Sequence, residues 1–343
     1  MKKIILSSLC IVTLLVFSQS PSGYYDNTEN ITGQALKEAL YDTIKDHTEY
    51  PYTSSSTDVW NILRKSNMDP DDSANVILVY TNQSVNGAQE YNSGKGWSRE
   101  HVWAKSHGNF GTSIGAGTDL HNLMPADISV NSARNNRDYD DGGDRYYDNG
   151  GLISTDCFST TYSWEPREDV KGDVARAIFY MATRYNGDNN EPQLSIANTT
   201  NTIALCDNEN AIGYMGKLST LLAWHIQDPV DDFEIQRNNV IYTYQNNRNP
   251  FIDHPEYVLK IWGDITQTND IFTDNYTLTH KGKTLKICTT DTKSTILYLY
   301  DTKGQLLLSK TFSTNTSCEV LHRGLYIVLI KQGNSIFRTK IAI

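Results

Sequence analysis

The chain has 343 residues, of which 38% are hydrophobic, and a formal net charge of −10. This length is too great for one ordinary domain and suits a large domain followed by a small one. The negative charge excludes a general electrostatic attraction to nucleic acid, so a polyanion would have to bind through a local basic patch or a metal ion.

The first twenty residues, MKKIILSSLCIVTLLVFSQS, have the pattern of a secretory signal peptide. Lys2 and Lys3 precede an apolar run from Ile4 to Phe17, and small polar residues follow that run. The run is shorter than the roughly twenty residues that a membrane-spanning helix needs. We therefore expect a secreted or cell-surface protein without stable membrane insertion.

Four cysteines remain after the signal peptide, and an even number in an exported protein permits disulfide bonds. The local pairings would be Cys157–Cys206 and Cys288–Cys318, which sequence alone does not establish. No CxxC pair occurs, so a zinc site built on cysteine is disfavoured.

Residues 24–262 combine helical and strand patterns and are expected to form one mixed unit. Apolar residues recur at three- and four-residue intervals in three segments, which predicts helices at 33–47, 57–64 and 170–185. A short apolar run predicts a buried strand at 76–80. The stretch 138–151 is rich in Asp, Tyr and Gly, which predicts a long loop.

The last of these helices has the most regular pattern. Val174, Ile178 and Met181 share one face, whereas Arg176 and Arg184 lie off it. The sequence therefore predicts an amphipathic helix with its apolar face toward the core.

After Trp262 the sequence changes to alternating, strand-forming runs separated by turn residues. These runs are 284–288, 296–300, 306–312, 325–331 and 337–343. Their spacing predicts a small antiparallel sandwich. The expected fold is α+β: a signal peptide at 1–20, a mixed domain at 21–265 and an all-β sandwich at 266–343.

Candidate chemistry concentrates around Glu100 and His101, which are neighbours in the stretch WSREHVW at 97–103. An imidazole titrates near neutrality and can take a proton from water. The carboxylate of Glu100 and the amide of Asn131 offer hard oxygen ligands, which favour Mg²⁺ over a thiol-preferring metal. Neighbouring strand residues point to opposite faces, so Glu100 and His101 converge only if the strand ends or bends there. Arg134, at helical spacing from Asn131, can meet a phosphate bidentately.

Other polar residues have alternative interpretations. Asp119 and His121 fit either direct catalysis or a structural hydrogen-bonded pair that supports a loop. Asp127 or Ser129 is expected to cap a helix rather than bind a metal. A run of aspartates follows, at positions 138, 140, 141, 144 and 148. It could hold Ca²⁺, but Gly142 occupies the third ligand position of an EF-hand loop, so a solvated loop is favoured.

Five ordered segments carry a family resemblance: REHVW at 99–103, DLHNLMPAD at 119–127, VNSARNN at 130–136, WEPREDVKGDVARAIFYMATRY at 164–185, and the run from RNNVIY at 237–242 through NRNPFIDHPE at 247–256. Together they resemble the bacterial endonuclease I family, whose members carry a ββα-metal (His-Me) finger. The resemblance implies that His101 is the general base and that Glu100 and Asn131 bind Mg²⁺, with Mn²⁺ or Ca²⁺ as substitutes. Members cut DNA, and often RNA, with little sequence preference.

The chain departs from this pattern in one place. Some members supply a transition-state arginine from a cysteine-bearing insertion soon after the histidine. Here the segment 105–110 is short and has neither residue. The role of charge stabilisation stays open among Arg134, Arg137, Lys105 and Arg99, with Arg134 as the first choice.

The C-terminal segment, with LYDTKGQLLLSK at 299–310 and RGLYIVLI at 323–330, resembles the sorting domain of the type IX secretion system. It implies contact with secretion machinery. The expected protein is a secreted, monomeric, metal-dependent and largely nonspecific endonuclease acting on DNA, with RNA as a second candidate substrate. Two alternatives are a phosphodiesterase or phosphatase for small molecules and a Ca²⁺-stabilised surface binding module without catalysis.

Overall fold

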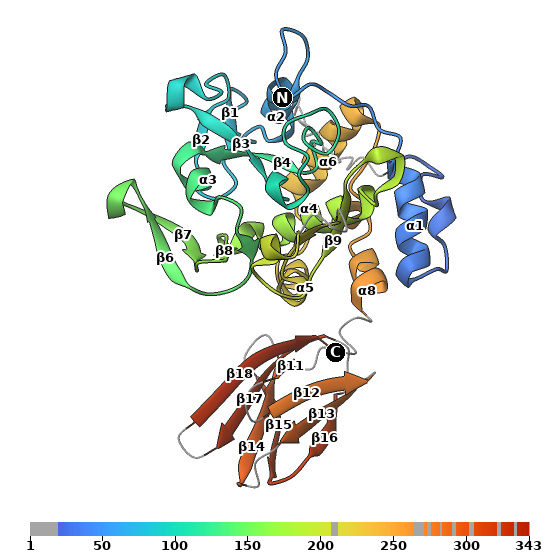
Figure 1. Ribbon diagram of the computed structural model, residues 1–343, viewed down its shortest axis with the longest axis vertical. Coiled ribbons are helices and arrows are strands. Elements are labelled where there is room, and N and C mark those ends of the chain that lie inside the picture. The colour runs from blue at the N-terminus through green and yellow to red at the C-terminus, as the bar shows by residue number, and fades with distance from the viewer. Residues whose placement is uncertain are drawn as a thin grey trace, which may run out of the picture.

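The structure is a computed structural model that describes residues 20–206, 212–263, 271–272, 276–281, 283–289, 293–301, 305–320, 324–332 and 335–342 (Figure 1). The predicted signal peptide, except its last residue, and the predicted boundary between residues 265 and 266 lie outside these ranges. Within them, helices and strands mix up to Trp262 and strands alone follow, as expected for an α+β fold. None of the helices in these ranges is long and apolar enough to cross a membrane.

The three helices that the sequence predicts in the N-terminal part are confirmed, and they correspond to α1, α2 and α4. The α-helices are α1 (Gly33–Ile44), α2 (Val59–Ser66), α3 (Ile128–Arg134), α4 (Lys171–Arg184), α5 (Leu218–Gln227), α6 (Asp232–Gln245), α7 (Pro250–Asp253) and α8 (Glu256–Trp262). Helix α2 begins at Val59 because Asp58 caps it. The Asp58 carboxylate accepts from the Asn61 amide at 3.1 Å, and the Asn61 side chain accepts from the Asp58 amide at 3.2 Å.

The strands of the same part form small sheets. They are β1 (Asn75–Ile77), β2 (Ser84–Asn86), β3 (Trp97–His101), β4 (Leu123–Asp127), β5 (Asp138–Tyr139), β6 (Asp144–Asp148), β7 (Ile153–Ser159), β8 (Ser163–Glu165), β9 (Gln193–Ile196) and β10 (Ile212–Met215). The pairs β1–β2, β3–β4 and β9–β10 each form a two-stranded sheet, and a four-stranded sheet has the order β5-β8-β7-β6.

The predicted strand at 76–80 is only partly a strand. Strand β1 ends at Ile77, although Leu78, Val79 and Tyr80 are buried as expected. The chain reverses just beyond, at Asn82, whose φ is +56°. Asn tolerates this left-handed conformation and is common in turns, so the apolar run continues into a turn.

The expected loop at 138–151 contains two strands, so that prediction is wrong. Strand β5 pairs in parallel with β8, with Asp138 opposite Ser163, and β6 pairs antiparallel with β7. Asp138 and Tyr139 are buried. The aspartates led to the loop prediction, because Asp is normally rare in a strand and common in a turn.

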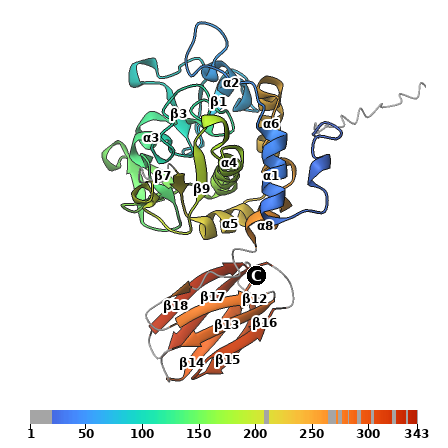
Figure 2. The same ribbon diagram turned by 45° about the vertical axis from the view of Figure 1, so that its right-hand side comes forward.

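Helix α4 is the central helix of the N-terminal part and packs beside α1 and α5 (Figure 2). Val174, Ile178 and Met181 are fully buried, as the sequence predicts. Every other residue of the helix except Asp173 is buried too. The helix therefore packs on all sides, rather than with one face as an amphipathic surface helix would.

The two arginines that lie off the apolar face are buried in ion pairs. Arg176 donates through Nε to Glu234 at 2.8 Å, and Arg184 donates through Nη1 and Nη2 to Glu191 at 2.6 and 2.8 Å. Each bidentate carboxylate allows a charged group to be buried in the interior.

A ββα unit carries the candidate residues. Strands β3 and β4 pair antiparallel, with Trp97 opposite Asp127 and His101 opposite Leu123. Helix α3 follows β4 directly, because the Asp127 carboxylate caps it by accepting from the amides of Ser129 and Val130 at 2.8 and 3.1 Å. This confirms Asp127 as the helix cap.

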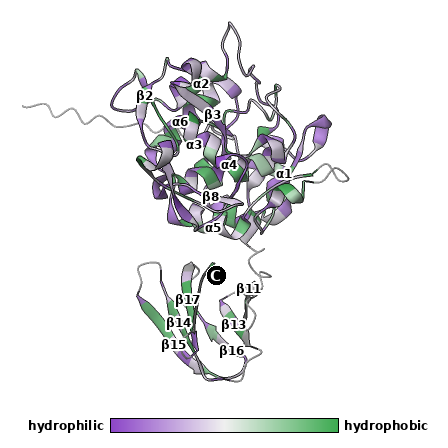
Figure 3. Ribbon diagram, turned by 60° about the vertical axis from the view of Figure 1, so that its left-hand side comes forward, coloured by the Kyte–Doolittle hydropathy of each residue, from purple (hydrophilic) through white to green (hydrophobic). Residues whose placement is uncertain are grey.

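The C-terminal part consists of two four-stranded sheets, ordered β11-β12-β13-β16 and β15-β14-β17-β18. The strands are β11 (Ile271–Phe272), β12 (Tyr276–Lys281), β13 (Thr284–Thr289), β14 (Thr295–Tyr300), β15 (Leu306–Phe312), β16 (Thr316–Glu319), β17 (Leu325–Gln332) and β18 (Ser335–Ala342). Hydrophobic residues lie along β14 and β17 (Figure 3). Side chains from both sheets pack together in one hydrophobic core. The five predicted runs are confirmed, whereas β11, β12 and β16 were not predicted.

The structure contains neither of the local disulfide pairings among its described residues. Cys157, Cys206 and Cys318 are free thiols. The register places Cys318 opposite Leu285, three residues along β13 from Cys288. Three residues span roughly 10 Å of strand, which is more than a disulfide can bridge.

Candidate active site

His101 is the last residue of β3 and is 6% exposed. Its Nε2 lies 2.9 Å from the carbonyl oxygen of Gly117, and its ring stacks on Tyr52 with 5.8 Å between centroids. A carbonyl oxygen only accepts, so Nε2 carries the hydrogen and Nδ1 keeps its lone pair. Burial lowers the pKa of His101 to about 4, which leaves the ring neutral near pH 7.

Glu100 is buried on the neighbouring position of β3. Its Oε1 accepts a hydrogen bond from the Tyr80 hydroxyl at 2.6 Å and lies 3.1 Å from Nη1 of Arg134. The Tyr80 hydroxyl also lies 2.8 Å from that of Tyr139. Burial raises the pKa of Glu100, while Arg134 and Tyr80 act in the opposite direction. Both of these contacts use Oε1, and the backbone amide of His101 also acts on the carboxylate as a hydrogen-bond donor.

Arg134 is held in the interior at 1% exposure. Its Nη1 donates to the carbonyl oxygen of His101 at 3.0 Å, and its Nη2 donates to that of Val102 at 2.8 Å. Its guanidinium therefore ties the Glu100 carboxylate to the main chain that follows β3. This burial does not fit the prediction that Arg134 meets a phosphate.

Asn131 lies on α3 against β3 and is half-buried. Its Nδ2 donates to Ser98 Oγ at 3.0 Å and to the Arg99 carbonyl oxygen at 3.4 Å. Its amide oxygen accepts no hydrogen bond from the described part of the chain. Asn131 thus keeps its amide oxygen free, while the Tyr80 and Arg134 contacts of Glu100 use Oε1, within the same ββα unit.

Two of the other candidate cations, Arg99 and Arg137, are held by contacts within the protein. The guanidinium of Arg99 lies between the rings of Tyr52 and Trp60, at 3.3 and 3.8 Å from their centroids, and donates to the Tyr52 carbonyl oxygen. Arg137 donates through Nε to the carbonyl oxygen of Thr160 at 2.8 Å. Stacking and main-chain contacts hold both groups in place.

Lys105 differs from these arginines because it is exposed, in the short helix Lys105–His107 that follows β3. It forms no salt bridge with the described residues. Its charge contributes to the lowered pKa of His101. Lys105 is therefore the candidate cation with a free head group near the imidazole.

Asp119 and His121 are fully buried and belong to a structural network. Asp119 Oδ2 accepts from the hydroxyls of Tyr180 and Tyr185, both at 2.9 Å, and Oδ1 accepts from the amide of His121 at 2.9 Å. His121 Nε2 lies 3.3 Å from the Asn247 carbonyl oxygen. Of the two interpretations of this pair, the structure favours loop support.

Two residues that position the site were missed by sequence reasoning. Asn122 accepts from the Trp103 amide at 2.6 Å and donates to its carbonyl oxygen at 3.3 Å, which fixes the chain just after His101. Its position within the motif DLHNLMPAD could have identified it as a site residue. Tyr80, which binds Glu100, stands twenty residues earlier in an apolar run and gave none.

Two aspartates of the run are held by protein donors. Asp138 accepts from the amides of Thr202 and Gly216, both at 2.7 Å, and Asp148 accepts from the Ser129 hydroxyl at 2.7 Å. Since both aspartates are buried, a solvated loop is wrong for them. Over the described ranges, no group of three or more His, Cys, Asp or Glu side chains is arranged to hold a metal ion.

Known proteins resemble the N-terminal part of the chain. The family profile described as Endonuclease I matches residues 32–256. An extracellular ribonuclease of Bacillus subtilis (strain 168) is 50% identical over 242 residues, 70% of this chain and 78% of that protein. The corresponding ribonuclease of Bacillus amyloliquefaciens is 49% identical over 240 residues, with 70% and 78% covered.

An extracellular deoxyribonuclease of Aeromonas hydrophila is 29% identical over 135 residues, 39% of this chain and 49% of that protein. The matched family range ends at residue 256, before the C-terminal sheets, so their role as a sorting domain stays a prediction. The chain belongs to the endonuclease I family and is a hydrolase of phosphodiester bonds.

Proposed function

We propose that this protein is a secreted, metal-dependent endonuclease that acts as a monomer on RNA and DNA, with His101 as the general base. The observation that carries the proposal is the hydrogen bond between His101 Nε2 and the Gly117 carbonyl oxygen. It fixes the tautomer, so that Nδ1 can take a proton from a water molecule. The lowered pKa keeps that nitrogen unprotonated at neutral pH.

Glu100 and Asn131 fit the metal that the family implies. Asn131 offers an amide oxygen that no described donor engages. Glu100 offers Oε2, which is not the oxygen that the Tyr80 hydroxyl and the closest Arg134 nitrogen contact, and both oxygens are hard ligands. Two protein ligands with several waters suit Mg²⁺. A bound Mg²⁺ would neutralise charge on the phosphate and stabilise the leaving oxygen.

Arg134 is a positioning residue in this proposal. It pairs with one oxygen of Glu100 and holds the His101 carbonyl oxygen, so it fixes both neighbours without touching substrate. Lys105 takes the role of phosphate contact, because it is exposed and its charge acts on the imidazole of His101. Such contacts carry no sequence information, so specificity is low.

The proposed substrates, RNA and DNA, are supported by the similar nucleases and by the expected phosphate contacts of the site. Similar proteins are an extracellular ribonuclease and an extracellular deoxyribonuclease, which supports an exported enzyme for both polymers. Binding rests on local phosphate contacts because the net charge is negative. Salt should therefore weaken it.

Replacing Glu100 with glutamine tests the metal site. E100Q removes the charged ligand with little change in volume, so we expect the Mg²⁺ concentration for half-maximal cleavage to rise about tenfold or more. The measurement is an Mg²⁺ titration of RNA cleavage. D144N is the matched control, since Asp144 is an exposed carboxylate on β6. An unchanged titration for E100Q, or full wild-type activity in EDTA, would overturn the metal assignment.

A further inference from the structure

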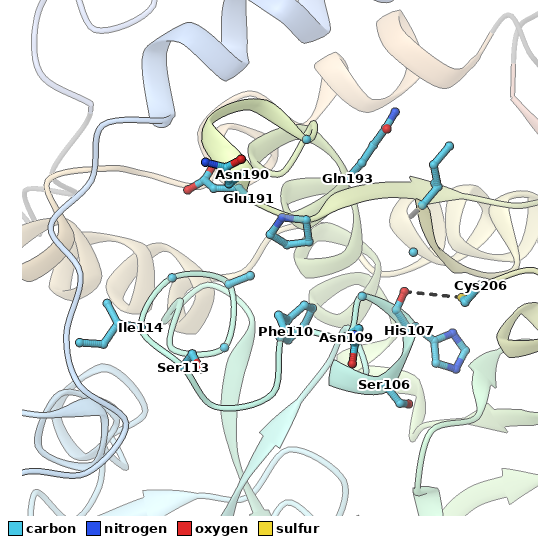
Figure 4. A pocket seen from close by; sticks show the side chains of 18 of the residues that line it. Ser106, His107, Asn109, Phe110, Ser113, Ile114, Asn190, Glu191, Gln193 and Cys206 are labelled. Atoms are coloured by element: carbon cyan, nitrogen blue, oxygen red, sulfur yellow. Dashed lines mark hydrogen bonds between the residues drawn. The ribbon is translucent and has the colours of Figure 1, made fainter. Parts of the chain in front are cut away.

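A pocket of about 580 Å³ opens beside the candidate base (Figure 4). Segments 106–117 and 187–193 supply most of its lining. Two lining residues also contact His101: the Gly117 carbonyl oxygen lies 2.9 Å from Nε2, and the Phe110 ring centroid lies 6.2 Å from that of His101. A group in this pocket would therefore lie next to the proposed reaction centre.

The lining of the pocket does not suit a phosphate. No lysine or arginine lines it among the described residues. Its carboxylates are Glu49, which is exposed, and Glu191, which Arg184 binds through both oxygens. An uncharged ligand fits this surface better than an anion.

Phe110 supplies an aromatic surface that packs closely against Gly108. A Cβ atom at Gly108 would lie 2.6 Å from Phe110 Cδ1 and 2.8 Å from Leu194 Cδ2. Only glycine lets the ring pack this closely. The ring is half-buried and points into the pocket (Figure 4). Aromatic rings of this kind stack on nucleobases, and every base has a face to offer.

Three residues with exposed amide side chains line the pocket: Asn109 lies next to Phe110, whereas Asn190 and Gln193 lie across the pocket on segment 187–193 (Figure 4). None makes a side-chain hydrogen bond within the described part of the chain, whereas the buried amides of Asn122 and Asn247 bond to protein groups. An amide can donate and accept. This set can therefore bind the edges of different bases without selecting one.

We propose that this pocket binds one unstacked nucleobase beside the phosphate that is cut, with Phe110 as the stacking surface and the three amides as edge contacts. The inference rests on the proposed function and extends it to single-stranded nucleic acid as the preferred substrate. A base inside a duplex must first unpair and unstack, which costs free energy. Single-stranded RNA already exposes such bases.

Phe110 variants test the proposal. F110L keeps apolar packing and removes the aromatic face, while F110Y keeps that face. We expect F110L to raise KM for a single-stranded RNA about tenfold, the size of one lost base stack, with kcat changed much less. Cleavage of the duplex of the same sequence should change less than about twofold. F110Y should restore most of the single-strand KM that F110L loses, because it keeps the aromatic face. The control L152A, whose side chain is 82% exposed, should match wild type.

Binding in EDTA separates this proposal from the catalytic one. We expect F110L to weaken the affinity for a labelled single-stranded oligonucleotide, measured by fluorescence anisotropy, about tenfold relative to F110Y. Equal losses on single strands and duplexes, or no loss in either assay, would overturn the base pocket. Phe110-dependent binding by a wild type that cuts nothing would keep the pocket and reject the proposed function. Thermal unfolding of F110L checks that it folds.

Discussion

Replacing His101 with alanine is expected to lower kcat for RNA and plasmid cleavage by roughly 10²–10⁴-fold. The imidazole is the neutral base near pH 7, and the Gly117 carbonyl oxygen orients it. No other described histidine makes this contact. KM should change little, because the ring is 6% exposed and the substrate is held mainly through phosphates.

The matched control for this prediction is H254A. His254 lies after α7 and is hydrogen-bonded to Glu256, away from the ββα unit. H254A should keep wild-type kcat within about twofold. Circular dichroism and thermal unfolding show whether H101A folds. A folded H101A enzyme with near wild-type kcat would reject His101 as the base while leaving the nuclease activity intact.

Replacing Arg134 with methionine is expected to lower the free energy of unfolding by about 3–5 kcal/mol, because Glu100 loses its buried partner. Arg134 and Glu100 side chains are 1% and 3% exposed. Urea unfolding in EDTA measures the effect without a metal ion near Glu100. The double variant E100Q/R134M should recover part of the loss, since residue 100 then carries a neutral amide instead of an unpaired buried carboxylate.

The control for this pair is R145M. Arg145 also pairs with a carboxylate, Asp156, but their side chains are 40% and 77% exposed. Exposed pairs contribute about 0–1 kcal/mol, so R145M should unfold almost like wild type. If R134M were as stable as R145M, the ion pair would not hold the site together.

Local patterns predicted the parts of the site that lie close in sequence. The periodicity of α4, the cap at Asp127 and the adjacency of Glu100 and His101 all depend on residues within a few positions of each other. The requirement that the strand end at His101 is also met, because β3 stops there. Helical spacing placed Asn131 and Arg134 on one short helix, as α3 shows.

Contacts between distant segments could not be predicted in the same way. Tyr80 reaches Glu100 across twenty residues, and Gly117 reaches His101 across sixteen. The spacing of Arg134 gave no sign that its side chain turns inward to carbonyl groups after β3. The sequence does not show whether a given arginine is exposed or buried. Only the fold therefore distinguishes an arginine that contacts phosphate from one in a buried ion pair.

The two alternative interpretations, a small-molecule phosphodiesterase and a binding module, are distinguished from an endonuclease by a circular nucleic acid. A small-molecule phosphodiesterase would hydrolyse a chromogenic diester and leave a circular polymer intact. A surface binding module stabilised by Ca²⁺ would cut neither. Within the described residues, the aspartates at 138 and 148 are already bonded to protein donors, which weighs against the second interpretation.

The most direct measurement is incubation of the mature protein with circular single-stranded RNA and supercoiled plasmid, in Mg²⁺ and in EDTA, followed on a gel. We predict that Mg²⁺ converts both circles to linear and shorter products and that EDTA stops the reaction. Intact circles in Mg²⁺, with a protein shown to be folded, would contradict the account.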